Sequence, residues 1–135
     1  MAQAKKLGLF ASGAATQKYM QAIQDQQEIM GAIADMVIET YAMESAVLRA
    51  QKIAEKQGET AAALPVGMAR TYLTQAMEKV ESSARKVIAA VADGDMLRTQ
   101  LAVLRRLAKY EPFDTIDLRQ QIAQRMIEQG KYTLT

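Results

Sequence analysis

Asp35 and Glu39 come closest to a catalytic arrangement in this chain of 135 residues. They stand four residues apart, so on a helix their carboxylates share one face. Such a pair could do acid–base work. The alternative is that each carboxylate pairs with an arginine of a neighbouring helix, because an unpaired buried charge is costly. Arg85 and Arg105 are available for this, and we favour the structural ion pairs.

Glu78 and Glu81 have the three-residue spacing found in metal sites of helical bundles. The di-iron pattern on such helices needs Glu-x-x-His, and the chain contains no histidine. We therefore expect no metal here, and solvated glutamates beside Lys79 and Arg85.

Four cations crowd one later segment, which could read phosphates: Arg98, Arg105, Arg106 and Lys109. Acidic residues follow closely, at Glu111, Asp114 and Asp117. No aromatic side chains are interleaved to stack on bases. The net charge of +2 is also too small to indicate a nucleic acid or an anionic membrane as partner. We predict no nucleic-acid binding.

The chain has neither cysteine nor histidine, which removes several kinds of active site. A Cys/His zinc site, a thiol nucleophile and a Ser-His-Asp triad are excluded within this segment. The glycines are scattered, so there is no phosphate loop. The first residues make a poor signal peptide, and no run approaches the roughly 20 apolar residues of a membrane span. We expect a cytoplasmic location without direct membrane insertion, which the absence of cysteine fits.

Apolar residues recur at helical spacing along the chain, and no segment alternates with period two. This predicts an all-α protein of one domain, an antiparallel (up-and-down) bundle of four to five helices. The expected helices span 2–20, 26–57, 68–92, 96–109 and 115–129. The expected helix starts are capped by Asp25 with Glu28, by Asp95, and by Asp114 or Thr115. Gly58 and Gly130 are expected to end the helices that precede them. The alternative is that the first two helices are continuous. Residues 58–67, with Pro65, are expected to form a loop.

The segment 27–56 carries apolar residues on two helical faces. One stripe comprises Met30, Ile33, Val37, Tyr41, Val47 and Leu48. The second comprises Ile29, Met36, Met43 and Ala50. A helix that is apolar on two sides is expected to be buried between neighbours, so we predict that this is the central helix of the bundle.

The amino-acid sequence of the predicted central helix resembles a segment of the acyl-CoA dehydrogenase family. Ile33–Ile53 reads IADMVIETYAMESAVLRAQKI and is similar to the helix with the Leu-Ala-Asp signature in those enzymes. The closest resemblance is to the C-terminal helical domain of the very-long-chain subgroup. Tyr41–Met43 matches its Tyr-Ala/Gly-Met step, and Leu48–Ala50 matches in part its Ser-Arg-Ala step.

Two later segments extend the resemblance over nearly the whole chain. Val80–Val87 (VESSARKV) is similar to the family's Ile-Glu-Ala-Ala-Ala-Arg-Ile stretch. Lys109–Pro112, Ile127-Glu128 and Lys131-Tyr132 are similar to the final helix and tail of that domain.

The resemblance implies a parent enzyme that binds FAD, removes a proton from acyl-CoA and passes a hydride to the flavin. The family's catalytic glutamate and flavin-contacting residues lie in an upstream core, so no catalytic, cofactor-binding or metal residue is carried onto this segment. The expected role is that of an accessory C-terminal domain, a fragment of the larger enzyme, that steadies the dimer.

Its expected partner is the upstream catalytic core, docked on a face of the first helix that includes Leu7, Leu9 and Phe10. Self-association into a homodimer is a second possibility. The alternative function is a stand-alone helical interaction module.

Overall fold

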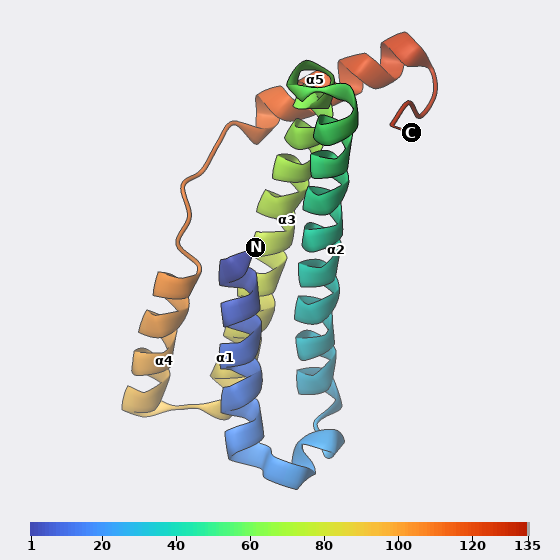
Figure 1. Cartoon of the computed structure of the whole chain (residues 1–135). Coiled ribbons are helices and arrows are strands. Elements are labelled where there is room, and N and C mark those ends of the chain that lie inside the picture. The colour runs from blue at the N-terminus through green and yellow to red at the C-terminus, as the bar shows by residue number, and fades with distance from the viewer. Residues whose placement is uncertain (135) are drawn as a thin grey trace. The chain divides into compact units, whose positions relative to one another are not determined.

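The computed structural model describes residues 1–134, which form five α-helices, one 3₁₀ helix and no strand (Figure 1). The elements are α1 (Ala2–Tyr19), η1 (Met20–Asp25), α2 (Gln27–Gln57), α3 (Glu59–Val91), α4 (Gly94–Leu107) and α5 (Thr115–Gln129). The predicted all-α class is confirmed.

The chain divides into two compact units. Unit 1 comprises Met1–Ala42 and Ala76–Tyr110, and unit 2 comprises Met43–Gln75 and the segment that begins at Glu111. Each of the long helices α2 and α3 therefore contributes to both units. Within unit 1, α1 runs antiparallel to its part of α2, and α4 lies against α1 (Figure 1).

The core of unit 1 is built from small side chains with a few larger ones between them. Helix α1 buries Ala4, Leu7, Ala11 and Ala15, which follow each other at intervals of three or four residues. The other buried hydrophobic residues of this unit are Ile29, Met36, Ala76, Met77, Val80, Ala84, Val87, Ile88, Leu104 and Ala108. Alanine stripes let helix backbones approach closely, and the larger side chains then fill the remaining space.

Unit 2 is a helical hairpin crossed by α5 (Figure 1). Gly58 alone separates α2 from α3, and its φ of 86° is the left-handed conformation that favours glycine. At the start of α5, Asp114 Oδ1 accepts a hydrogen bond from the Asp117 amide at 3.0 Å. Gly130 ends α5 with a φ of 61°. These three predicted helix-end residues are confirmed.

The predicted loop at 58–67 is wrong, because α3 begins at Glu59 and continues through Pro65. Three alanines precede this proline and favour helix. Pro65 is itself buried, and so is Gly67. A Cβ at Gly67 would lie 3.0 Å from Cδ2 of Leu118, so glycine here allows α5 to approach α3. Packing within unit 2 thus outweighs the helix-breaking tendency of Pro65.

The break between the first two helices is present, but Asp25 does not cap α2. Helix α1 ends where Met20 adopts a φ of 49°, and Asp25 is the last residue of η1. The Gln26 carbonyl accepts the first α2 hydrogen bond, from the Met30 amide at 2.9 Å. In the same way α4 begins at Gly94, so Asp93 takes the N-cap position expected for Asp95.

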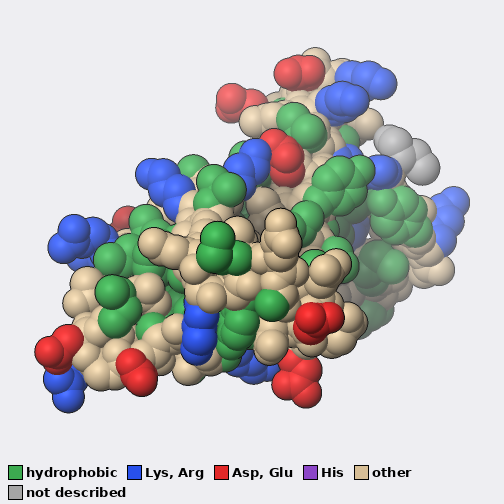
Figure 2. Space-filling model, turned by 90° about the horizontal axis from the view of Figure 1, so that it is seen from below, with side chains coloured by type: hydrophobic (Ala, Val, Ile, Leu, Met, Phe, Trp, Pro, Cys, Tyr) green, Lys and Arg blue, Asp and Glu red, His purple; other side chains and the backbone are tan. Residues whose placement is uncertain are grey.

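Helix α2 is buried on one face, and the predicted burial on two sides is wrong. Ile29, Met36, Met43 and Ala50 are at most 8% exposed. On the other stripe, Met30, Val37, Tyr41 and Leu48 are 43–73% exposed. The other two members of that stripe, Ile33 and Val47, are half-buried, so the described residues cover the first stripe fully and the second only in part. Hydrophobic side chains reach the surface at several places between the charged ones (Figure 2).

Apolar side chains are also exposed on two other helices. On α1, Leu7 is fully buried whereas Leu9 is 75% exposed, so the proposed docking face of this helix is split between core and solvent. Helix α5 has no buried residue, and Ile116 and Ile127 are 68% and 76% exposed.

Replacing Leu7 with alanine is expected to destabilise the chain by about 2–5 kcal/mol, because it leaves a cavity in the core of unit 1. Leu9→Ala on the same helix is the matched control and is expected to change the free energy of unfolding by less than about 0.5 kcal/mol. Urea unfolding followed by far-UV circular dichroism measures both. Equal losses for the two variants would contradict the burial pattern.

Glycine-to-alanine substitutions at Gly58 and Gly31 are expected to have opposite signs. Gly58→Ala forces a β-carbon into the left-handed region and costs about 1–2 kcal/mol. Gly31 lies inside α2, and a β-carbon at this position would have no atom within 4 Å, so Gly31→Ala gains about 0.5–1 kcal/mol of helix stability. Thermal unfolding of both variants tests this, and a gain at Gly58 would overturn the assigned turn.

Candidate functional site

Glu39 forms an ion pair with Lys79 across α2 and α3 of unit 1. Glu39 Oε1 accepts a hydrogen bond from Lys79 Nζ at 2.9 Å. The glutamate side chain is 15% exposed and the lysine 65%. Because one partner is largely in water, the pair contributes at most about 1 kcal/mol. Lysine thus takes the place of the arginine expected from the sequence.

The other three predicted ion-pair residues are not gathered at Glu39. Arg85 Nη2 donates to Glu81 Oε1 at 2.9 Å, one turn earlier on its own helix. Asp35 and Arg105 are exposed on α2 and α4. The four residues therefore do not form one cluster, and Asp35 and Glu39 do not form a buried acid–base pair.

Tyr110 is a titratable group that sequence reasoning missed. It ends unit 1, just after α4. Burial raises the pKa of its phenol, and the negative charges of Glu78 and Glu81 on α3 raise this pKa further. Nothing in the sequence signals this arrangement, because about thirty positions separate the tyrosine from the two glutamates.

Among residues 1–134, no group of three or more His, Cys, Asp or Glu side chains could hold a metal ion. The same residues contain no helix that is both long and apolar enough to cross a bilayer. In the basic segment, Arg98 Nη1 donates to Asp95 Oδ1 at 2.7 Å. Arg105 and Arg106 are exposed on the last turn of α4. The side chains of these three arginines are therefore exposed to solvent.

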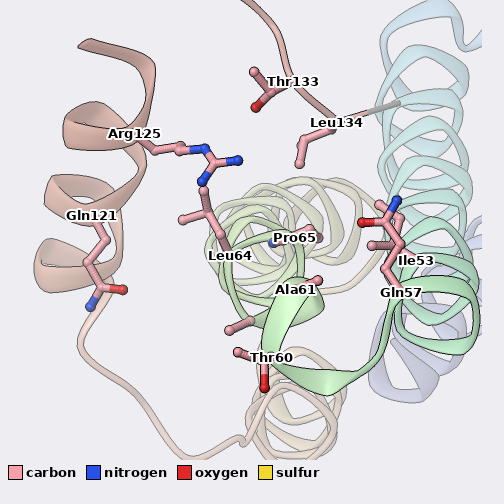
Figure 3. Close-up of a pocket in the computed structure, with 11 residues that line it drawn as sticks. Ile53, Gln57, Thr60, Ala61, Leu64, Pro65, Gln121, Arg125, Thr133 and Leu134 are labelled. Atoms are coloured by element: carbon pink, nitrogen blue, oxygen red, sulfur yellow. The ribbon is translucent and has the colours of Figure 1, made fainter. Parts of the chain in front are cut away.

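Unit 2 contains a pocket of about 420 Å³ between the end of α2, the start of α3, α5 and the C-terminal tail (Figure 3). Ile53, Leu64 and Pro65 supply much of its apolar wall. Arg125 extends from α5 toward α3, while Thr133 and Leu134 lie above it on the tail (Figure 3). The tail is held by Arg49, whose Nη2 donates to the Leu134 carbonyl at 2.6 Å.

The chemistry that this pocket can perform is limited. Its polar lining consists of Gln57, Thr60, Gln121, Arg125 and Thr133. These described residues offer one cation and neutral amides and hydroxyls, without a carboxylate or other general base. A hydroxyl without an adjacent base is a weak nucleophile. The pocket can therefore hold a small polar group, but it lacks the parts of a catalytic site.

Comparison with known proteins identifies relatives of the whole segment. Residues 3–106 match the family described as "Acyl-CoA dehydrogenase, C-terminal domain". A Bacillus subtilis (strain 168) protein named "Probable acyl-CoA dehydrogenase" is 41% identical over 132 residues, which cover 98% of this chain and 22% of that protein. An acyl-CoA dehydrogenase from Bacillus anthracis, whose crystal structure contains FAD, superposes with a TM-score of 0.95. It is 39% identical, over 98% of this chain and 23% of its own.

The chain thus spans less than a quarter of the length of each of these two relatives. The share of this chain that aligns is nearly complete in both comparisons, so the similarity concerns one segment of longer polypeptides.

The raised pKa of Tyr110 predicts a loss of stability in alkali. A phenol whose pKa is higher in the folded state stabilises the fold below its unfolded pKa, and this stability is lost as pH rises through the folded value. The chain is therefore expected to lose more unfolding free energy above pH of about 10 than Tyr110→Phe does. Urea unfolding at a series of pH values measures this difference.

The cause of the shift can be tested separately by spectrophotometric titration. Glu81→Gln and Glu78→Gln are each expected to lower the pKa of Tyr110, because each removes a negative charge that disfavours the phenolate. The phenol is isolated by subtracting the Tyr110→Phe titration. Glu28→Gln, on α2, is the control and should leave the pKa of Tyr110 unchanged. A shift caused equally by all three variants would contradict the assigned causes.

Proposed function

Because the chain belongs to the family of acyl-CoA dehydrogenase C-terminal domains, we propose that it is the accessory helical domain of a longer, FAD-dependent acyl-CoA dehydrogenase. The observation that carries the proposal is the match of 98% of this chain to only 22–23% of two acyl-CoA dehydrogenases. A stand-alone interaction module is the less favoured alternative, since it gives no reason for that match.

The proposed role is structural, because the described residues do not fit a flavin. The 420 Å³ pocket offers one arginine and no glycine-rich phosphate cradle. The Glu39–Lys79 pair links the sides of α2 and α3, and Lys79 is largely in water. The dehydrogenation of an acyl-CoA would therefore be done by residues of the parent outside this segment, with FAD bound there.

The finer assignments rest on the residues that carried the resemblance. Ile33–Asp35 and Tyr41–Met43 support a parent of the very-long-chain type, in which this segment forms a single C-terminal domain. A dimer-steadying role is supported by apolar side chains of α5 left at the surface, such as Ile116 and Ile127. We further propose a cytoplasmic parent that assembles as a homodimer.

The decisive experiment compares the 135-residue chain with the full-length polypeptide that contains it. The full-length protein is expected to carry flavin absorbance and to reduce an artificial electron acceptor when acyl-CoA substrates are added. The isolated chain is expected to do neither. Flavin bound by the isolated chain, or a full-length protein without dehydrogenase activity, would overturn the proposal.

Glu39 offers a test of the structural role within the full-length enzyme. Glu39→Gln removes the charge that pairs with Lys79 but keeps the size of the side chain. The expected result is a kcat/KM within about twofold of the parent value, because a residue with no part in the transition state leaves the activation free energy unchanged. A loss of about a hundredfold or more would show that this carboxylate is catalytic.

A further inference from the structure

Helix α2 presents an uncharged, largely apolar stripe at the surface of unit 1. At about 100° per residue, the stripe, which we call the α2 outer stripe, comprises Met30, Ala34, Val37, Ile38 and Tyr41. Val37 and Ile38 are each 62% exposed, and Tyr41 is 73% exposed. The opposite face of the same segment is buried through Ile29 and Met36. This part of the helix therefore has two apolar faces, of which unit 1 covers one.

The composition of the stripe is unusual for a face that meets water. A surface helix normally places charged side chains opposite its buried face. Here the charged residues of this segment, Asp35 and Glu39, lie to one side of the stripe, and Glu39 is directed to Lys79 of α3. Contiguous exposed apolar surface of this kind marks an interaction site.

The stripe also permits close approach of another element. Gly31 lies beside it, and a β-carbon built at Gly31 would meet no atom within 4 Å. Ala34, in the middle of the stripe, is exposed and small. Small residues next to larger apolar ones let a second backbone come near while Val37 and Ile38 fill the space between.

We propose that the α2 outer stripe is the surface on which the catalytic part of the same acyl-CoA dehydrogenase polypeptide docks. This inference rests on the proposed function, and it names the face and the occupant. In the two relatives, the segment equivalent to this chain is 22–23% of the polypeptide, so more than three quarters is available to cover the stripe. A covalently attached partner has a high effective concentration, so it is expected to bind the stripe in preference to a second copy of the domain.

Cysteine accessibility in the full-length polypeptide tests this proposal. The 135 residues contain no cysteine, so a single one can be introduced without background from this segment. Val37→Cys and Ile38→Cys probe the stripe with conservative changes. Asp35→Cys, on the same helix and also exposed, is the matched control. The maleimide labelling rate of each variant is divided by its rate in denaturant, which corrects for the intrinsic reactivity of the thiol. Labelling of the unsubstituted polypeptide is subtracted to correct for cysteines outside this segment.

The expected result is that Val37→Cys and Ile38→Cys react at least about tenfold more slowly than Asp35→Cys, at every protein concentration over about a hundredfold range. Rates equal to that of Asp35→Cys would overturn the proposal. Protection that disappears on dilution would also overturn it, because it would assign the stripe to a second copy. Flavin content and dehydrogenase activity of the unsubstituted polypeptide are measured separately, so a failure of the proposed function is distinguished from a failure of the docking face.

Discussion

The helices of this chain carry few large side chains, and this constraint requires them to pack closely. Aromatic residues make up 5% of the chain and tryptophan is absent. The interior of unit 1 is therefore filled by Leu7, Met36, Ile88 and Leu104, set among fully buried alanines such as Ala11 and Ala84. Small residues give little buried area each, so the helices must lie near one another for the larger side chains to be covered.

The same constraint governs unit 2 at the level of single residues. Gly67 of α3 is buried, and glycine suits this position because a larger residue would press against Leu118 of α5. Thr71, one turn later, is also buried, and its hydroxyl donates to the Gly67 carbonyl at 2.9 Å. A polar side chain is tolerated in this position because its hydrogen bond stays within the helix. Close packing and local hydrogen bonding thus accompany the continuous course of α3 after Pro65.

Polar interactions in this chain are peripheral to its packing. The Glu39–Lys79 and Glu81–Arg85 pairs each have at least one side chain substantially in water. The first pair links α2 to α3 and the second lies within α3, and neither brings a base together with a nucleophile. An accessory domain that supports a catalytic part elsewhere is consistent with this distribution of charge.

Helix content, class and several helix ends were predictable from the sequence, because they depend on local interactions. Gly58 and Gly130 favour left-handed conformations whatever surrounds them, and Asp114 caps α5 with its own side chain. The start of α3 was not predictable, because Pro65 is a strong local signal for a break, whereas the close packing of α5 on Gly67 is a contact between residues distant in the chain. The raised pKa of Tyr110 was likewise hidden, since it arises between residues distant in the chain.

The order of residue types is enough to establish that α2 is apolar on two faces, that cysteine and histidine chemistry is absent from these 135 residues, and that the chain resembles part of an acyl-CoA dehydrogenase. The burial of one face of α2, the pairing of Glu39 with Lys79 and the different exposures of Leu7 and Leu9 became evident from the folded chain. The physical reason is that side-chain periodicity is a property of one helix, whereas burial depends on the neighbours that the rest of the polypeptide supplies.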